Sequence, residues 1–125
     1  MNLLAFDTST DTLFIAVQRD ADVWQHQGAG GAKASASLIP TVRTLLAQAG
    51  FSFDTLDAIV FGRGPGSFTG LRTACAVAQG LAFGAGIKVL PVDTLLAVAE
   101  EARWQQAREL PRFSALALLD ARMDE

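Results

Sequence analysis

The segment Ala58–Ala74, AIVFGRGPGSFTGLRTA, carries the clearest fold signal in the chain. A short apolar run, Ala58–Phe61, ends at three closely spaced glycines and a proline, and Ser67 then opens a second apolar run. Many proteins hold phosphate with a strand, a glycine turn and a helix start in this order, because free backbone N–H groups at the helix start point at the anion. The same order also makes a tight corner. The segment therefore predicts a corner and leaves a phosphate site as a hypothesis.

The glycine-rich part of this segment matches neither of the common nucleotide-binding signatures. No lysine follows the glycines at P-loop spacing, and Thr69 stands where the dinucleotide fingerprint needs a third glycine. Gly64 and Gly66 allow a positive φ or a close approach, Pro65 stiffens the bend, and Ser67 can cap the next helix. An anion or partner contact at the helix start and a rigid structural corner both remain open.

Strand and helix patterns extend on both sides of this segment. Three short strand patterns joined by brief turns precede it and predict an antiparallel meander, near residues 2–7, 12–19 and 22–27. A helix is predicted from Ser35 or Ser37 to Ala49, with Pro40 in its first turn and Gly50 as its end. After the quoted strand, the patterns predict a helix over 67–84, a strand over 87–92, a helix from Asp93 or Thr94 to about 106, and a strand over 114–120.

This order, βββαβαβα followed by a new strand, predicts an α/β fold with a mixed sheet and helices on its faces. It matches one half of a ribonuclease H-like or actin-like ATPase (ASKHA) architecture. LLAFDTST near the start and LALLDARM near the end are both apolar strand patterns that stop at an aspartate, which suggests a duplicated unit. We therefore interpret residues 1–110 as one actin-like ATPase subdomain and residues 111–125 as the first strand of a second.

Composition narrows the class of protein. Half of the 125 residues are apolar and the net charge is −3, with eight Arg and two Lys that form no cluster, which argues against an electrostatic grip on nucleic acid. The single cysteine, Cys75, excludes an internal disulfide and a Cys-based zinc site. Met1 leads directly into a strand pattern without a signal peptide, and Arg72 and Gln79 interrupt the longest apolar stretch. These features predict a cytoplasmic protein with no membrane contact.

Asp7, Thr8, Ser9 and Thr10 place a carboxylate and three hydroxyls at the end of the first strand. Such a turn can cradle nucleotide phosphate in actin-like kinases, because short hydroxyl side chains stand beside free backbone N–H groups. Asp and Thr are also common caps of tight hairpins, and turn propensities favour that interpretation. We keep the turn as a candidate vestigial phosphate- or nucleotide-binding site.

The helix predicted after the corner is apolar around nearly its whole circumference. Its pattern assigns one face to the sheet (Leu71, Cys75, Ala78, Leu81, Ala82) and leaves a second face of small residues (Gly70, Ala74, Val77, Gly80, Gly84). Such a helix is buried on both sides, in this case by a second half of the chain, or is covered by another protein. We favour a partner protein, and in its absence a homodimer related by a two-fold axis. The predicted interface combines this helix with the one before it, through Leu38, Val42, Leu45, Gly70, Ala74, Val77, Gly80, Leu81 and Gly84.

No catalytic residue and no metal ligand set is predicted. His26 is the only histidine and has no second ligand at metal spacing, and no Ser/His/Asp set can be built around it. Cys75 lies among apolar residues, where cysteine usually serves as core.

The segment Gly62–Arg72 resembles the TsaB (YeaZ) family, whose hallmark is a strand followed by GRGPGSFTGLR. The residues that carry the match are Gly62, Arg63, Gly64, Pro65, Gly66, Ser67, Phe68, Thr69, Gly70 and Arg72. The resemblance extends over essentially the whole chain, through LAFDTST, SLIPTVRTLLAQAG, VDTLLAVA and the terminal LDARM. It implies a two-domain, actin-like fold about twice as long as this chain, of which these residues form the N-terminal domain.

The resemblance also implies a role in bacterial formation of tRNA N6-threonylcarbamoyladenosine (t6A). TsaB-like proteins are non-catalytic partners of the metalloenzyme TsaD and work with the ATPase TsaE, so ATP or ADP would belong to the complex and tRNA contact would be indirect. TsaD carries metal-binding histidines on its first helix, whereas this chain reads KASASLIP, with Ser35 where many TsaB-like sequences keep one histidine. The alternatives are an actin-like small-molecule kinase or nucleotide-binding domain and a homodimeric interaction module, and no residue supports a peptidase.

Overall fold

The computed structural model describes residues 1–112 and 114–118 of the chain. Its elements follow the order β1 (Asn2–Asp7), β2 (Thr12–Arg19), β3 (Asp22–Ala29), α1 (Ala34–Ala49), β4 (Ala58–Gly62), α2 (Phe68–Ala85), β5 (Lys88–Val92) and α3 (Thr94–Gln106). Short 3₁₀ turns at Gly31–Lys33 and Phe53–Thr55 lie before α1 and β4. The predicted meander, the two later strands and the three helices are confirmed to within a few residues.

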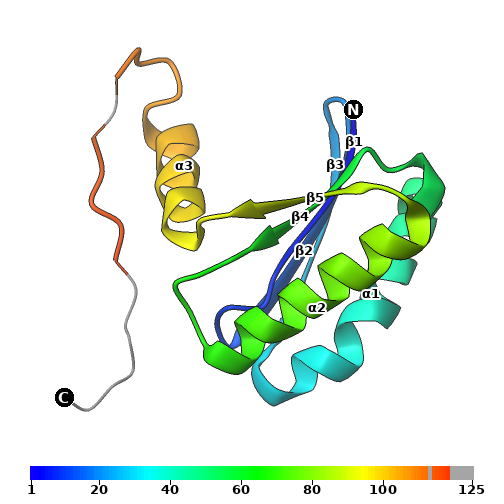
Figure 1. Cartoon of the computed structure of the whole chain (residues 1–125). Helices are drawn as coiled ribbons and strands as arrows, with labels where there is room; N and C mark the ends of the chain where they lie inside the picture. The colour runs from blue at the N-terminus through cyan, green and yellow to red at the C-terminus, as the bar shows by residue number, and fades with distance from the viewer. Residues whose placement is uncertain (113, 119–125) are drawn as a thin grey trace.

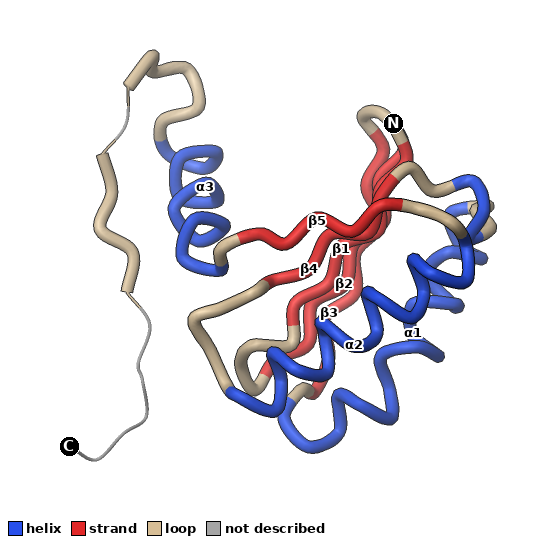
Figure 2. The backbone as a smooth tube through the Cα atoms, viewed as in Figure 1, coloured by secondary structure: helices blue, strands red, loops and turns tan. Residues whose placement is uncertain are grey.

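The five strands form one mixed sheet in the order β3-β2-β1-β4-β5. β1 and β3 both pair antiparallel with β2, whereas β4 pairs parallel with β1 and β5 parallel with β4. Helices α1 and α2 cover the same face of this sheet, and α3 lies on the other side, beyond the end of β5 (Figures 1 and 2). The mixed sheet predicted from the element order is confirmed.

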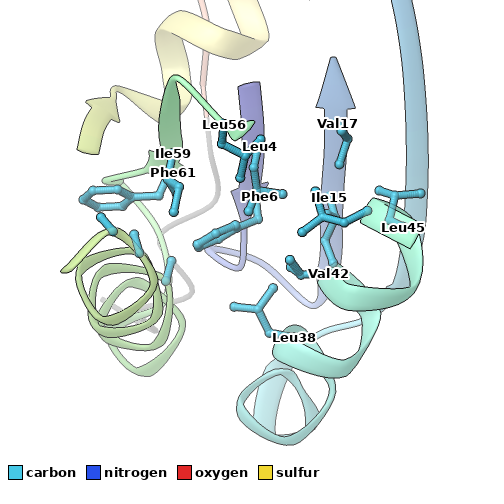
Figure 3. Close-up of a cluster of buried hydrophobic side chains, with 14 of the residues drawn as sticks. Leu4, Phe6, Ile15, Val17, Leu38, Val42, Leu45, Leu56, Ile59 and Phe61 are labelled. Atoms are coloured by element: carbon cyan, nitrogen blue, oxygen red, sulfur yellow. The ribbon is translucent and has the colours of Figure 1, made fainter. Parts of the chain in front are cut away.

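The hydrophobic core lies between the sheet and the helix pair α1 and α2. In the ladders Phe6 is opposite Ile15 on one side and Phe61 on the other, so large side chains form a row on one face. Leu38 and Val42 of α1 point toward this row, and all five residues are buried (Figure 3). The alternation of each strand and the helical spacing of α1 thus bring their apolar sides together.

The ends of the helices follow the local signals, with one exception. Ser67 caps α2 by accepting from the Gly70 N–H at 3.0 Å, and Gly50 ends α1 in the left-handed region at a φ of 75°. The exception is the start of α1. The helix follows the 3₁₀ turn directly and begins at Ala34, before the predicted start at Ser35 or Ser37. Pro40 therefore lies inside the helix and not in its first turn. Proline has no backbone N–H, so the carbonyl of Ala36, four residues earlier, has no donor within the helix. Both residues are exposed, and water can donate to this carbonyl instead.

The last predicted strand does not form within the part of the chain that the structure describes. Residues 114–118 adopt neither helix nor strand, and residues 119–120 of that prediction lie outside the described residues. A strand needs a neighbour to complete its backbone hydrogen bonds, and these residues pair with none of the five strands. Along the described residues, no helix combines the length and apolarity needed to cross a membrane.

Candidate functional site

The turn Asp7–Thr10 and the motif loop Gly62–Gly70 pack directly against each other. The Thr8 hydroxyl donates to the Gly70 carbonyl, and the Ser67 N–H donates to the Ser9 carbonyl over 2.7 Å. Thr8 and Ser9 are only 1% and 3% exposed. Two segments that are about 60 residues apart in sequence therefore form a single corner at the carboxyl ends of β1 and β4, with Thr8 and Ser9 buried inside it.

Three glycines of the motif are required by this close packing, and a Cβ atom on the first of them, Gly62, would lie 1.9 Å from Asp7 Oδ2. A Cβ atom on residue 70 would lie 1.9 Å from the Thr8 carbonyl oxygen, and one on residue 66 would lie 2.4 Å from the Ser9 Cβ. Both distances are far inside van der Waals contact, so any larger residue must displace the turn. Gly64 adds a φ of 109°, as the corner interpretation predicted.

Asp7 links three elements at this corner. Its Oδ1 accepts from the Ser9 N–H at 2.7 Å and from the Ser9 hydroxyl, while its Oδ2 accepts from the Thr94 hydroxyl at 3.3 Å. The Thr94 oxygen in turn accepts from the Gly64 N–H at 3.2 Å. Sequence reasoning treated Thr94 only as a helix start. Nothing local could reveal its link to Asp7, because the two residues are 87 positions apart.

The hydroxyls of the candidate phosphate turn are all bonded within the chain. Thr8 and Ser9 bond as described, and Thr10 Oγ1 accepts from the Thr12 N–H at 3.2 Å. These contacts describe a structural corner. A phosphate at this turn stays a prediction.

Replacing Thr8 with valine should lower the free energy of unfolding by about 1–3 kcal/mol, because the Gly70 carbonyl would be left without this buried donor. Thr73→Val on α2 is the matched control, since the Thr73 hydroxyl bonds the Thr69 carbonyl near solvent. Urea unfolding followed by circular dichroism measures both changes. Equal effects of the two substitutions would contradict a buried structural hydrogen bond at Thr8.

Five of the nine predicted interface residues lie in the protein core. Leu38, Val42, Leu45, Gly70 and Ala74 are buried, so their assignment to an exposed surface is wrong. The reason is the geometry of α2, which turns a small residue toward the sheet at every fourth position, 70, 74, 78 and 82. Small side chains let this helix lie close to the strands, and the larger Leu71, Cys75 and Leu81 flank the contact, half-buried.

The outward side of α2 carries a distinct row, which we term the α2 stripe: Phe68, Arg72, Ala76, Gly80 and Phe83. Their spacing of three or four residues places them on one helix face, and all five are exposed. Phe83 is 92% and Phe68 68% exposed, and the Arg72 guanidinium lies 3.9 Å from the centre of the Phe68 ring.

Three other predicted interface residues of α2 lie outside the stripe. Val77 and Leu81 are half-buried, and Gly84 is exposed. Exposed Ile39 lies on the neighbouring α1. Phe83 was not among the predicted interface residues, because α2 is apolar around nearly its whole circumference and the pattern does not mark the solvent side.

Other polar groups offer no competing site in the described part of the chain. No three His, Cys, Asp or Glu side chains gather there closely enough to hold a metal ion. Arg103 donates to Glu100 on the solvent side of α3, and this hydrogen bond lowers the pKa of the Glu100 carboxyl.

Comparisons with known proteins bear on this fold and motif. A family model described as TsaD, tRNA N6-adenosine threonylcarbamoyltransferase, matches residues 26–125. The tRNA threonylcarbamoyladenosine biosynthesis protein TsaB of Haemophilus influenzae is 37% identical over all of this chain and 51% of its own length. The solved structure of YeaZ from Pseudomonas aeruginosa is 40% identical, with a TM-score of 0.77 over 84% of this chain and 49% of its own.

A more distant likeness concerns the fold alone. RuvC of Thermus thermophilus in complex with a Holliday junction is 16% identical, with a TM-score of 0.55 over 91% of this chain and 84% of its own. The predicted ribonuclease H-like and actin-like ATPase fold class is confirmed. The chain spans about half the length of the curated relatives it matches. The TsaD family model covers most of the chain, and the relatives from H. influenzae and P. aeruginosa are named TsaB and YeaZ, the family that the Gly62–Arg72 motif predicted. The chain therefore belongs to the TsaB (YeaZ) family.

Proposed function

We propose that this chain serves in bacterial t6A formation as a non-catalytic subunit that binds and supports a TsaD-like threonylcarbamoyltransferase. The α2 stripe, together with the exposed side of α1, is the docking surface. The observation that carries the proposal is Phe83, an aromatic side chain near the C-terminal end of α2 that is 92% exposed. Family membership supplies the pathway, because the H. influenzae relative is named as a tRNA threonylcarbamoyladenosine biosynthesis protein.

The shape of the stripe favours docking by a helix of another protein. Phe68 and Phe83 stand near its two ends, and the small residues Ala76 and Gly80 lie between them. Aromatic side chains are frequent energetic anchors of interfaces, and small residues allow two helices to approach closely. A contact between α1 and α2 and an equivalent helix pair would form a four-helix interface of standard size, on the order of 1,600 Å² in total.

The hydrogen bonds at the corner favour a structural role for the motif, in which it positions α2, over a role in binding phosphate. The Thr8 and Ser9 hydroxyls are buried and bonded to this chain, so they hold α2 in place against the end of β1. ATP or ADP would then be bound only as part of the complex, which includes a TsaE-like ATPase. The net charge of −3 fits tRNA contact made mainly by the partner subunit.

Binding of the TsaD-like subunit should depend on Phe83. Replacing Phe83 with alanine should weaken binding roughly 30-fold, the effect of losing about 2 kcal/mol at an aromatic anchor. Gly80→Arg should abolish it, because the charge would be trapped in the contact. Phe14→Ala is the control, since Phe14 lies on the opposite face of the sheet. Isothermal titration calorimetry with the purified partner measures the three affinities.

Unchanged affinity of both stripe variants would refute the docking surface. Light scattering of the chain alone tests the homodimeric alternative, because a dimer through the same stripe should dissociate in Gly80→Arg. A dimer that forms through the stripe without any affinity for the partner would favour the homodimeric interaction module.

A further inference from the structure

Strand β3 is an unprotected edge of the sheet. Among the described strands it has a neighbour only on its β2 side, and six of its eight residues are exposed. The opposite edge, β5, is five residues long and contains Lys88 and Pro91, which hinder pairing with a further strand. β3 contains neither lysine nor proline, and its one acidic residue, Asp22, stands at its start. The backbone groups of β3 that face away from β2 can therefore bond another strand.

A hollow of about 270 Å³ lies between this edge and α1. Gln25 and His26 line it from the strand, and Thr41, Thr44 and Gln48 line it from the helix. None of the residues that line it is Asp, Glu, Lys or Arg. Hydroxyl and amide groups can both donate and accept hydrogen bonds, so this lining suits an uncharged polar surface like itself.

The sequence of β3 is self-complementary in one antiparallel register. Facing residues of an antiparallel pair turn their backbone groups either both toward each other or both away, so a two-fold axis between two β3 strands must pass through a residue. An axis at His26 forms three kinds of pair between the copies: Val23 with Ala29, Trp24 with Gly28, and Gln25 with Gln27. The indole of Trp24 then lies opposite a glycine, two side-chain amides meet, and Asp22 stays outside the paired residues 23–29.

The same arrangement places two α1 helices at packing distance. α1 contacts both β2 and β3, so its axis lies over the space between these strands. Across a pair of β3 strands the two helix axes would be separated by two strand spacings, about 10 Å, which is the distance at which helices pack. Thr41, Thr44 and Gln48 would then face the same flank of the second copy and close the hollow. The contact thus has a helix layer in addition to the strand pair.

We propose that β3 pairs with β3 of a second copy of this chain, around a two-fold axis at His26 that joins the two sheets into one. A second copy is the occupant that fits, because each paired residue meets a matching one and the pairing brings in no Asp, Glu, Lys or Arg. Helical spacing puts Thr41 and Gln48 on the flank of α1 away from Ile39, so this contact is separate from the docking surface on the α2 stripe. One strand edge and one helix flank make a contact below about 1,200 Å², so the dimer should be weak and concentration-dependent.

A lysine at the two-fold axis tests the proposal. His26→Lys sets two like charges directly opposite each other, so the dissociation constant of the dimer should rise roughly fivefold or more. Gln106→Lys on α3 is the matched control, because it makes the same change in net charge at an exposed position outside the contact, and it should leave the constant unchanged. Sedimentation equilibrium over a range of concentrations measures the constants, and circular dichroism checks the fold. If His26→Lys does not fold, Gln25→Lys/Gln27→Lys takes its place, since it sets lysines opposite each other on the other face of the strand.

Disulfide formation tests the register. In a Cys75→Ser background, His26→Cys should give a covalent dimer on mild oxidation, because position 26 faces its own copy. Gln25→Cys should crosslink roughly tenfold more slowly, since it faces position 27 and reaches its own copy only along a diagonal of about 7–8 Å, too far for a disulfide without movement. Faster crosslinking of Gln25→Cys than of His26→Cys would overturn the register.

Two outcomes would overturn the proposal itself. One is a chain that stays monomeric at all concentrations and forms no crosslink at His26→Cys. The other is a dimer that withstands both His26→Lys and Gln25→Lys/Gln27→Lys but is lost in Gly80→Arg, because self-association would then occur through the α2 stripe.

Discussion

Replacing Gly70 with alanine should lower the free energy of unfolding by about 2–4 kcal/mol. The added Cβ would lie 1.9 Å from the Thr8 carbonyl oxygen, so α2 must shift away from the turn. That shift overpacks the corner and strains the buried hydrogen bond from the Thr8 hydroxyl to the Gly70 carbonyl. Circular dichroism during urea unfolding measures the loss.

Gly80→Ala in the same helix is the matched control and should act in the opposite direction. No atom lies within 4 Å of a Cβ built on residue 80, and the position is exposed. Alanine is favoured over glycine inside a helix by about 0.8–1.0 kcal/mol, so this variant should be more stable than the natural chain. If Gly70→Ala proved neutral or stabilising as well, the close contact between α2 and the Asp7–Thr10 turn would be absent in solution.

Arginine at position 74 should prevent folding, whereas arginine at position 76 should leave the fold intact. Ala74 is fully buried against the sheet, so Ala74→Arg overfills the core and buries an unpaired charge, at about 3–5 kcal/mol for the charge alone. A small domain is stable by only about 5–15 kcal/mol, which makes loss of cooperative unfolding the expected result.

Ala76→Arg tests the same helix from its solvent side. Ala76 is exposed, and such surface substitutions usually change stability by no more than about 0.5 kcal/mol. The charge should nevertheless disturb a partner that packs on the α2 stripe. Thermal unfolding distinguishes the two variants. A folded Ala74→Arg protein, or an unfolded Ala76→Arg protein, would mean that α2 is rotated relative to the structure.

The corner illustrates which part of the candidate site was predictable. The glycines, Ser67 and the Asp7–Thr10 turn were each recognisable as local signals, since a cap or a tight turn depends on a few neighbouring residues. Their mutual contacts were not predictable. The spacing of nearby residues reveals neither the hydrogen bond from Thr94 to Asp7 nor the one from Thr8 to Gly70.

The α2 helix shows a second feature that the sequence could not predict. The existence and the ends of α2 were predicted correctly. Its buried face was not, because the helix carries apolar and small side chains around nearly its whole circumference. Periodicity can orient a helix only when polar residues mark the solvent side. The exposure of Phe83 and the burial of Ala74 were both hidden for this reason.

By itself, the sequence determined the order and type of the elements from β1 to α3, the mixed sheet and the family to which the motif belongs, because periodicity, caps and turns act over a few residues. The tertiary structure alone decided which side of α2 meets the sheet, how Asp7 joins Thr94, and which sheet face stays open. These features depend on how closely two surfaces can approach, and that distance is set where segments far apart in the chain meet.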